Sequence, residues 1–483
     1  MHFTFMLSLN KYRLSLVTLL TLLLPLAVSA QQKWSLQQCI DYAIKNNITI
    51  KQGTITSERS SIDYKQAKLN FLPDVNASAS YAYNYGRTLD PTTYEFTTNE
   101  IQSANTSLNG NLVLFNGLQL QHALKQSKYE YMAGVEDLKK VQNDISLNVT
   151  SYYLQVLYNK EALKLAMDRV EAARETRNRT KALVDAGSVA QGNLLDDEAT
   201  LAAEELNVVN AENTLKSSLI DLSQLLELKY DETFDIESPP TVLPDQSSVA
   251  QTPDQIFNSA LGILPEIRSG EYRMKSAESG LSIARGTRYP RLSLFGNYGS
   301  SFSNANEEIV GNPISLGYYP NGQITQGGDV VLAPAFQYNT TEIGFLDQLD
   351  QNRSHAFGLS LSIPIFNNWS ANMNVQRAKL NMESSRYSDT DTRNRLYKSI
   401  VQAHNDASSA LKRYTAAEKS AAANDEAYSY AGKRYELGML SSVDYLIARN
   451  NKARADSELI QAKYQMMFSV KLLDFYLGKP LGF

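Results

Sequence analysis

The sequence predicts an α+β membrane protein in which two copies of one plan each combine a pair of β-strands with a long α-helical hairpin. Three observations lead to this fold class. The chain contains an internal repeat, four short segments alternate apolar and polar residues, and heptad patterns persist along the helical stretches.

Residues 1–30 have the pattern of a secretory signal peptide. Lys11 and Arg13 precede an apolar run over 14–28, and the small residues that follow it form a cleavage pattern. An uncleaved anchor is the weaker interpretation, because Pro25 interrupts the run and a spanning helix needs about 18 apolar residues.

The remaining chain is expected to be acidic and free of disulfides. The formal net charge is −5 before the basic leader is removed, so nucleic acid is not an expected partner. Cys39 is the single cysteine, and we expect it to be a small buried hydrophobe on a helix.

The repeat shows two constant offsets. Gly187 aligns with Gly438 at an offset of 251, which also brings "LFNG" at 114–117 onto "IFNN" at 365–368. Upstream, Pro73 aligns with Pro290 at an offset of 217, so the second copy holds 34 extra residues. We expect them in a long loop over the Gly-, Asn- and Pro-rich segment 303–354. The resulting plan is a first repeat over 31–229, a linker over 230–254, a second repeat over 255–477 and a tail over 478–483.

Four segments have the period-two alternation of β-strands, at 74–85, 105–115, 290–302 and 355–366. In the last, Phe357, Leu359 and Leu361 alternate with glycine and serine. This length and pattern are typical of barrel strands that span a membrane, and the alternative is a soluble, half-buried sheet. Four strands are too few to close a barrel, so a membrane location requires several copies of the chain.

The helical stretches are predicted at 35–70, 117–185 and 193–229 in the first copy, and at 253–288, 368–436 and 443–477 in the second. Heptad spacing relates Leu194, Leu201, Val208, Leu215 and Leu222, and again Leu446, Ala453, Ile460 and Met467. Such patterns indicate coiled-coil packing. An antiparallel coiled-coil rod explains the heptads equally well, but it does not explain the strands.

In this order of elements the chain resembles the TolC-like outer-membrane efflux proteins of Gram-negative bacteria. The resemblance covers nearly all of 31–480, and its more specific segments are "WSLQQCIDYAIKNN", "FLPDVNASASY", "LVLFNG", "LSIPIFNN" and "RYELGMLSSVDYLIARN". It implies a homotrimer with a 12-stranded β-barrel in the outer-membrane lipid and a periplasmic α-helical tunnel. It also implies that the linker 230–254 lies in an equatorial belt.

The resemblance places the two helical turns at the periplasmic tip, where a periplasmic adaptor protein and an inner-membrane pump dock. The expected docking residues are Gly187, Ser188 and Val189 in the first turn and Gly438, Met439 and Leu440 in the second. Gly187 and Gly438 are expected to adopt the positive φ that ends a helix.

The resemblance also implies a closed aperture at the tip, and this chain keeps only part of that pattern. Tyr435 and Asp444 match the family's tyrosine and first acidic residue, whereas Leu440 replaces an arginine, Ile447 a second acidic residue and Asn193 an aspartate. Three copies of Asp444 form a negative ring in one interpretation. In the other, Ser441 caps the following helix with Asp444 as its box partner.

No catalytic site is expected. The four histidines are scattered, no phosphate-binding loop or nucleophile motif is present, and neither an enzyme activity nor a cofactor is predicted. The expected function is the outer-membrane channel of a tripartite efflux or type I export system, which conducts its substrate passively. The alternative is a periplasmic coiled-coil scaffold without channel activity.

Overall fold

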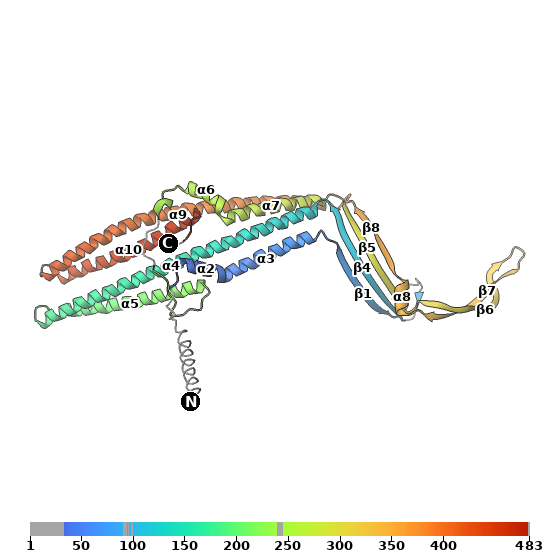
Figure 1. Ribbon diagram of the computed structural model, residues 1–483, viewed down its shortest axis with the longest axis horizontal. Helices are drawn as coiled ribbons and strands as arrows, with labels where there is room; N and C mark the ends of the chain where they lie inside the picture. The colour runs from blue at the N-terminus through green and yellow to red at the C-terminus, as the bar shows by residue number, and fades with distance from the viewer. Residues whose placement is uncertain (1–32, 90–93, 95, 98–99, 239–244, 482–483) are drawn as a thin grey trace, which may run out of the picture. The chain divides into compact units, whose positions relative to one another are not determined.

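The computed structural model describes residues 33–89, 94, 96–97, 100–238 and 245–481 (Figure 1). The predicted signal peptide over 1–30 lies outside the described residues, as does part of the linker. The chain divides into two compact units. One comprises the residues up to Arg59, Met132–Glu271 and Tyr387–Phe483, and the other comprises Ser60–Tyr131 and Tyr272–Arg386.

Within the described residues, eight helices form two sets with the same lengths of 11, 22, 67 and 35 residues. The first set is α2 (Leu36–Asn46), α3 (Ile48–Leu69), α4 (Gln119–Asp185) and α5 (Gln191–Leu225), and the second is α6 (Pro253–Ile263), α7 (Pro265–Gly286), α9 (Ser370–Glu436) and α10 (Ser442–Tyr476). Helices before the strands are offset by 217 residues and those after them by 251, as in the sequence repeat.

The single helices expected over 35–70 and 253–288 are each broken at one residue. Asn47 has ψ 132° and Leu264 has ψ 131°, so both are extended rather than helical. Leu264 precedes Pro265, whose ring disfavours a helical conformation at the residue before it. The Asn47 side chain instead donates to the Leu225 carbonyl and accepts from the Thr49 amide, which stabilises the break.

Four strands form one antiparallel sheet in the order β1-β4-β5-β8. They are β1 (Asp74–Asn84), β4 (Ile101–Asn116), β5 (Arg291–Ser303) and β8 (Ser354–Ser362). β4 begins four residues earlier than expected. β8 ends four residues earlier than expected, shortly before Pro364, which has no amide to donate to a sheet. A short pair, β2 (Thr88–Leu89) and β3 (Phe96–Thr97), lies between β1 and β4.

The prediction of a long loop over 303–354 is wrong. The structure has a β-hairpin there, β6 (Glu307–Ile324) with β7 (Val330–Glu342), followed by the short helix α8 (Phe345–Gln351). The glycines and prolines that suggested a loop are accommodated by three irregularities in the register of β6, while β7 keeps a regular alternation.

The helical unit has its core where the shorter helices and the linker meet the long helices. Tyr153 of α4 is 1% exposed and donates to the Glu237 carbonyl over 2.7 Å. Around it lie buried side chains from several elements, among them Cys39, Leu222, Leu226, Ile236, Met466 and Val470. A second cluster on the other repeat contains Ile256, Leu264, Ile267, Ile400 and Leu473. Burial raises the pKa of the Cys39 thiol to about 12, so this cysteine is unreactive at neutral pH.

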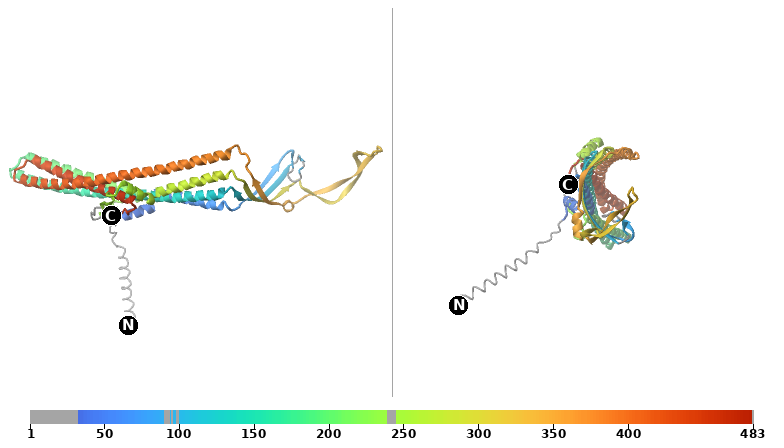
Figure 2. Two further views of the ribbon diagram at one scale, coloured as in Figure 1. Left: turned by 90° about the horizontal axis from the view of Figure 1, so that it is seen from above. Right: turned by 90° about the vertical axis from the view of Figure 1, so that its right-hand side faces the viewer.

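α4 with α5 and α9 with α10 form two antiparallel hairpins that lie side by side (Figure 2). Within them Leu194, Leu201 and Met467 of the predicted heptads are buried, while Val208 and Leu446 are half-buried. At 1.5 Å per residue, the 67 residues of α4 extend about 100 Å. Among the described residues, none of the helices has the length and hydropathy that crossing a membrane requires.

Candidate functional site at the hairpin tips

Both hairpins reverse direction through the same hydrogen-bonded turn. The Gly187 amide donates to the Val184 carbonyl and the Ser188 amide to the Leu183 carbonyl, each over 2.8 Å. In the second hairpin Gly438 donates to Tyr435 over 3.1 Å and Met439 to Arg434 over 2.8 Å. This pair of bonds is the Schellman motif, which satisfies the last carbonyls of a helix.

The motif needs a left-handed residue, and each turn has glycine there. Gly187 has φ 72° and Gly438 has φ 71°, which is the positive φ expected from the sequence. A Cβ built at either glycine meets nothing within 4 Å. The requirement for glycine is therefore conformational, with no steric contribution from neighbouring atoms.

The second turn leads into a capped helix. The Ser441 hydroxyl accepts from the Asp444 amide over 3.1 Å, as the capping interpretation requires. In a capping box the Asp444 carboxylate would accept from the Ser441 backbone amide. Here the carboxylate instead accepts from the Ser441 hydroxyl, over 2.7 Å. Capping uses the Asp444 backbone and leaves its exposed carboxylate accessible to solvent, so the cap and a negative ring are compatible.

Three tyrosines stack beside the second turn. The Tyr445 ring of α10 lies 4.8 Å from that of Tyr435, with an angle of 7° between the planes, and 5.6 Å from that of Tyr428, with an angle of 27°. The Tyr428 and Tyr445 hydroxyls are 2.8 Å apart and hydrogen-bonded. Burial raises the pKa of both Tyr435 and Tyr445, so both phenols remain neutral at physiological pH. The stack therefore joins α9 to α10 at the tip.

Ion pairs join one hairpin to the other. Arg179 of α4 lies 3.0 Å from Glu436 of α9, close to the two turns. Farther along, Lys463 of α10 reaches both carboxylate oxygens of Glu161 on α4, at 2.9 and 3.1 Å. Arg169 of α4 donates to the Ser457 hydroxyl over 2.9 Å. The two hairpins of one copy are thus connected along their length and at the tip.

A cavity of about 610 Å³ lies among the tips of α4, α5, α9 and α10. Five of the predicted tip residues line it, namely Val189, Asn193, Tyr435, Gly438 and Leu440. Gly187, Ser188, Met439 and Asp444 are exposed and are not among its lining residues. Ile447 is 53% exposed.

Sequence reasoning missed four residues whose side chains make the contacts described above. Tyr428, Tyr445, Arg179 and Glu436 all line the same cavity. The signal for Tyr445 was present, because Tyr435 and Tyr445 are ten residues apart and flank the second turn. Two antiparallel helices joined by a short turn bring residues on their two arms side by side, so aromatic residues that face one another across the turn can stack.

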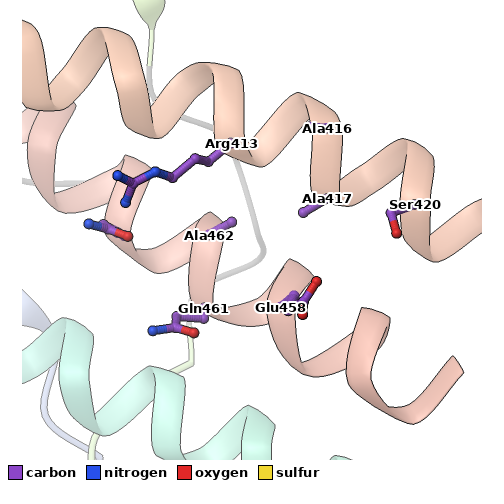
Figure 3. Close-up of a pocket in the computed structure, with 8 residues that line it drawn as sticks. Arg413, Ala416, Ala417, Ser420, Glu458, Gln461 and Ala462 are labelled. Carbon is purple, nitrogen blue, oxygen red and sulfur yellow. The ribbon is translucent and has the colours of Figure 1, made fainter. Parts of the chain in front are cut away.

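A second, shallower cavity of about 400 Å³ runs between α9 and α10 (Figure 3). Ala417 of α9 and Ala462 of α10 point into the gap between the two helices, and Arg413 and Glu458 lie at its edges. Small side chains on both helices leave a groove of the kind that receives side chains of a third helix.

No group of three or more metal-ligating side chains occurs among the residues that the structure describes. The features of the tip are therefore the turns, the stacked rings, the ion pairs and the cavity.

The family described as "Outer membrane efflux protein" matches residues 39–227 and 256–479. The chain belongs to this family. Escherichia coli Outer membrane protein TolC is 20% identical over 460 residues, which cover 93% of this chain and 83% of TolC. Toxin and drug export protein A of Aggregatibacter actinomycetemcomitans is 23% identical over 442 residues, which cover 89% of this chain and 83% of that protein.

Solved structures agree in fold. The Campylobacter jejuni CmeC outer membrane channel gives a TM-score of 0.69 at 20% identity, covering 93% of this chain and 86% of CmeC. The Vibrio cholerae outer membrane protein VceC gives a TM-score of 0.70 at 16% identity, covering 92% of this chain and 96% of VceC. This TolC-family protein is therefore an outer membrane efflux channel that lies in the outer membrane and extends into the periplasm.

Proposed function

We propose that three copies of this chain form the outer-membrane channel of a tripartite efflux or type I export system. An inner-membrane pump and a periplasmic adaptor deliver the substrate to the hairpin tips. The substrate then passes through a periplasmic helical tunnel and a 12-stranded barrel. The channel makes and breaks no chemical bonds, and conduction through it is passive.

The observation that carries this proposal is the pair of open sheet edges. β1 and β8 are the outer strands of the four-stranded sheet, so each has one row of backbone groups without a partner in that sheet. In hydrocarbon each unsatisfied group costs several kcal/mol. Pairing β8 of one copy with β1 of the next satisfies both rows, and three copies of four strands give the proposed barrel of twelve.

The strand surfaces support a lipid environment. β1, β4, β5 and β8 have 11, 16, 13 and 9 residues, and a tilted barrel strand needs about 9–11 residues to cross a bilayer. On β8, Phe357 is 82% exposed and Leu361 is 60% exposed. Side chains of this type at alternate positions suit the lipid face of a barrel.

The helical hairpins support the tunnel. The groove between α9 and α10 is suited to a helix of a neighbouring copy, which would continue the wall around the three-fold axis. At the entrance, three exposed Asp444 carboxylates would form a negative ring that favours cations.

Native mass spectrometry of the detergent-extracted protein tests the assembly, and the expected particle has three times the mass of the exported chain. Planar bilayer recordings test conduction, and the expected result is ohmic channels that need no energy source. A stable, water-soluble monomer after leader removal would overturn the proposal.

A further inference from the structure

The β6–β7 hairpin presents an uncovered apolar face. Cross-strand partners point to the same side of a hairpin, and the pairs Ile309 with Thr340, Tyr318 with Pro334 and Ile324 with Val330 define one side. Alternation along β7 adds further residues to this side. We define the apolar face as Ile309, Tyr318, Ile324, Val330, Leu332, Phe336 and Tyr338.

All seven side chains are exposed, from 45% for Phe336 to 72% for Tyr318. With about 150–200 Å² for each aromatic side chain and somewhat less for each aliphatic one, the exposed apolar area is roughly 600 Å². The largest patch on a typical monomer is about 300–600 Å² and is often functional. A two-stranded hairpin without a covered face is also marginally stable in water. The face therefore needs an occupant.

The base of the hairpin is fixed to the sheet. Gln348 of α8 is fully buried and makes three bonds to backbone groups of Ser303 and Ile343, over 2.8 to 3.0 Å. The Phe345 ring packs against Phe302 of β5 at 4.9 Å between centroids. The hairpin therefore projects from a rigid base at the C-terminal end of β5. This is the end opposite the one that α7 joins.

We propose that the occupant is a second copy of this chain, with the apolar faces of three β6–β7 hairpins packed against one another over the outer mouth of the barrel. The inference rests on the proposed trimer. Because α7 and α9 join the other ends of β5 and β8 and extend into the periplasm, the hairpins stand outside the cell.

Geometry brings the copies within reach of one another. Twelve strands about 4.8 Å apart and tilted about 40° close a ring roughly 24 Å across. An 18-residue strand such as β6 spans up to about 60 Å. Three hairpins on one rim are thus longer than the mouth is wide, and tethering gives them an effective concentration on the order of millimolar.

Charge argues against the membrane surface as occupant. Residues 292–352 contain six acidic residues and no lysine or arginine. Anionic headgroups repel such a segment. The apolar face itself is uncharged between Ile309 and Thr340 apart from Asp329 near the turn, so packing of sister hairpins buries no unpaired charge along the face.

Disulfide trapping tests the proposal. Phe336→Cys puts a thiol on the apolar face, and Asn339→Cys is the matched control, because Asn339 is also exposed on β7 but points to the opposite side. The natural Cys39 does not need to be replaced in these variants, because its burial makes it unreactive. Oxidation of the purified trimer should convert Phe336→Cys into a covalent dimer plus monomer, because one disulfide joins two of three thiols. The Asn339→Cys chain should remain monomeric on the denaturing gel.

Four outcomes overturn the inference while leaving the trimer intact by native mass spectrometry. The first is that Phe336→Cys forms no covalent dimer, and the second is that both variants form equal amounts of dimer. The third is a dimer yield that falls when the protein is diluted. The fourth is that the Phe336→Cys thiol is shielded from a maleimide on whole cells but reacts with it in the purified trimer. The last would identify an external partner. Loss of the trimer itself would count against the proposed function instead. Replacing 310–339 with Asn-Gly should also raise single-channel conductance, and unchanged conductance would contradict a covered mouth.

Discussion

Removing the central ring of the tyrosine stack should loosen the hairpin tips locally. Tyr445→Ala deletes two stacking contacts, each worth about 0.5–1.5 kcal/mol, and one hydrogen bond worth about 1 kcal/mol. For this half-buried ring the expected loss is about 3 kcal/mol, the lower end of the range for large aromatic residues. Tyr445→Phe keeps both stacks and loses the bond to Tyr428, at a cost of about 1 kcal/mol. Because each 1.4 kcal/mol is tenfold, the local opening equilibrium should rise by about 100-fold and about fivefold, respectively.

Hydrogen exchange with mass spectrometry measures this opening directly. Tip peptides from the 428–445 segment should exchange faster by these factors, while peptides around the buried Tyr153 should not change. Tyr430→Ala is the matched control, because Tyr430 lies on α9 near the tip but is 60% exposed and should shift stability by no more than about 0.5 kcal/mol. Tip exchange within twofold of the natural protein in Tyr445→Ala would refute the reasoning.

Four further predictions concern other parts of the chain. Gly438→Ala should cost about 1 kcal/mol of tip stability and Gly438→Asn less, because only the left-handed backbone is at issue; equal exchange rates in both variants would contradict this. Asp444→Asn should lower cation preference in planar bilayers without loosening the tip, since the Ser441 cap remains; unchanged selectivity would remove the negative ring. Gln348→Leu should remove three buried hydrogen bonds to the backbone of Ser303 and Ile343 and cost about 3 kcal/mol, seen as faster proteolysis of the β6–β7 hairpin. Partial burial raises the pKa of Asp235, but the hydrogen bond and charge of Lys160 outweigh it and hold that pKa below its usual range. This contribution to stability should be present above about pH 4 and lost as the pH falls through the lowered pKa. The fluorescence of Trp34, whose amide donates to the Asp235 carbonyl over 3.0 Å, can follow this loss in the natural chain and in Asp235→Asn.

The parts of the fold predictable from sequence are those with a period or a required conformation. The helical hairpins follow from heptads such as Leu194 and Leu201, whose spacing repeats regardless of their partners. Gly187 and Gly438 were predicted for a local reason, because a helix that ends in a tight turn needs a left-handed residue. The strand β8 shows its alternation with little interruption.

The parts that could not be predicted depend on distant partners. Asn47 breaks a helix because its amide reaches the Leu225 carbonyl, 178 residues away. β6 was missed because glycine and proline at its irregular positions mask the alternation that β7 shows. At the tip, Arg179 and Glu436 are 257 residues apart, and sequence spacing alone does not pair a basic residue with an acidic one at that distance.

The two unpaired edges of the sheet have a consequence for the newly exported chain. Until sister molecules arrive, the free rows of β1 and β8 accept any extended segment, including the wrong edge of another copy. Correct closure requires three β8–β1 pairings, whereas misassembly requires only one wrong pairing. Rapid overproduction should therefore favour periplasmic aggregates over channels, and a chaperone that shields these edges should restore the yield.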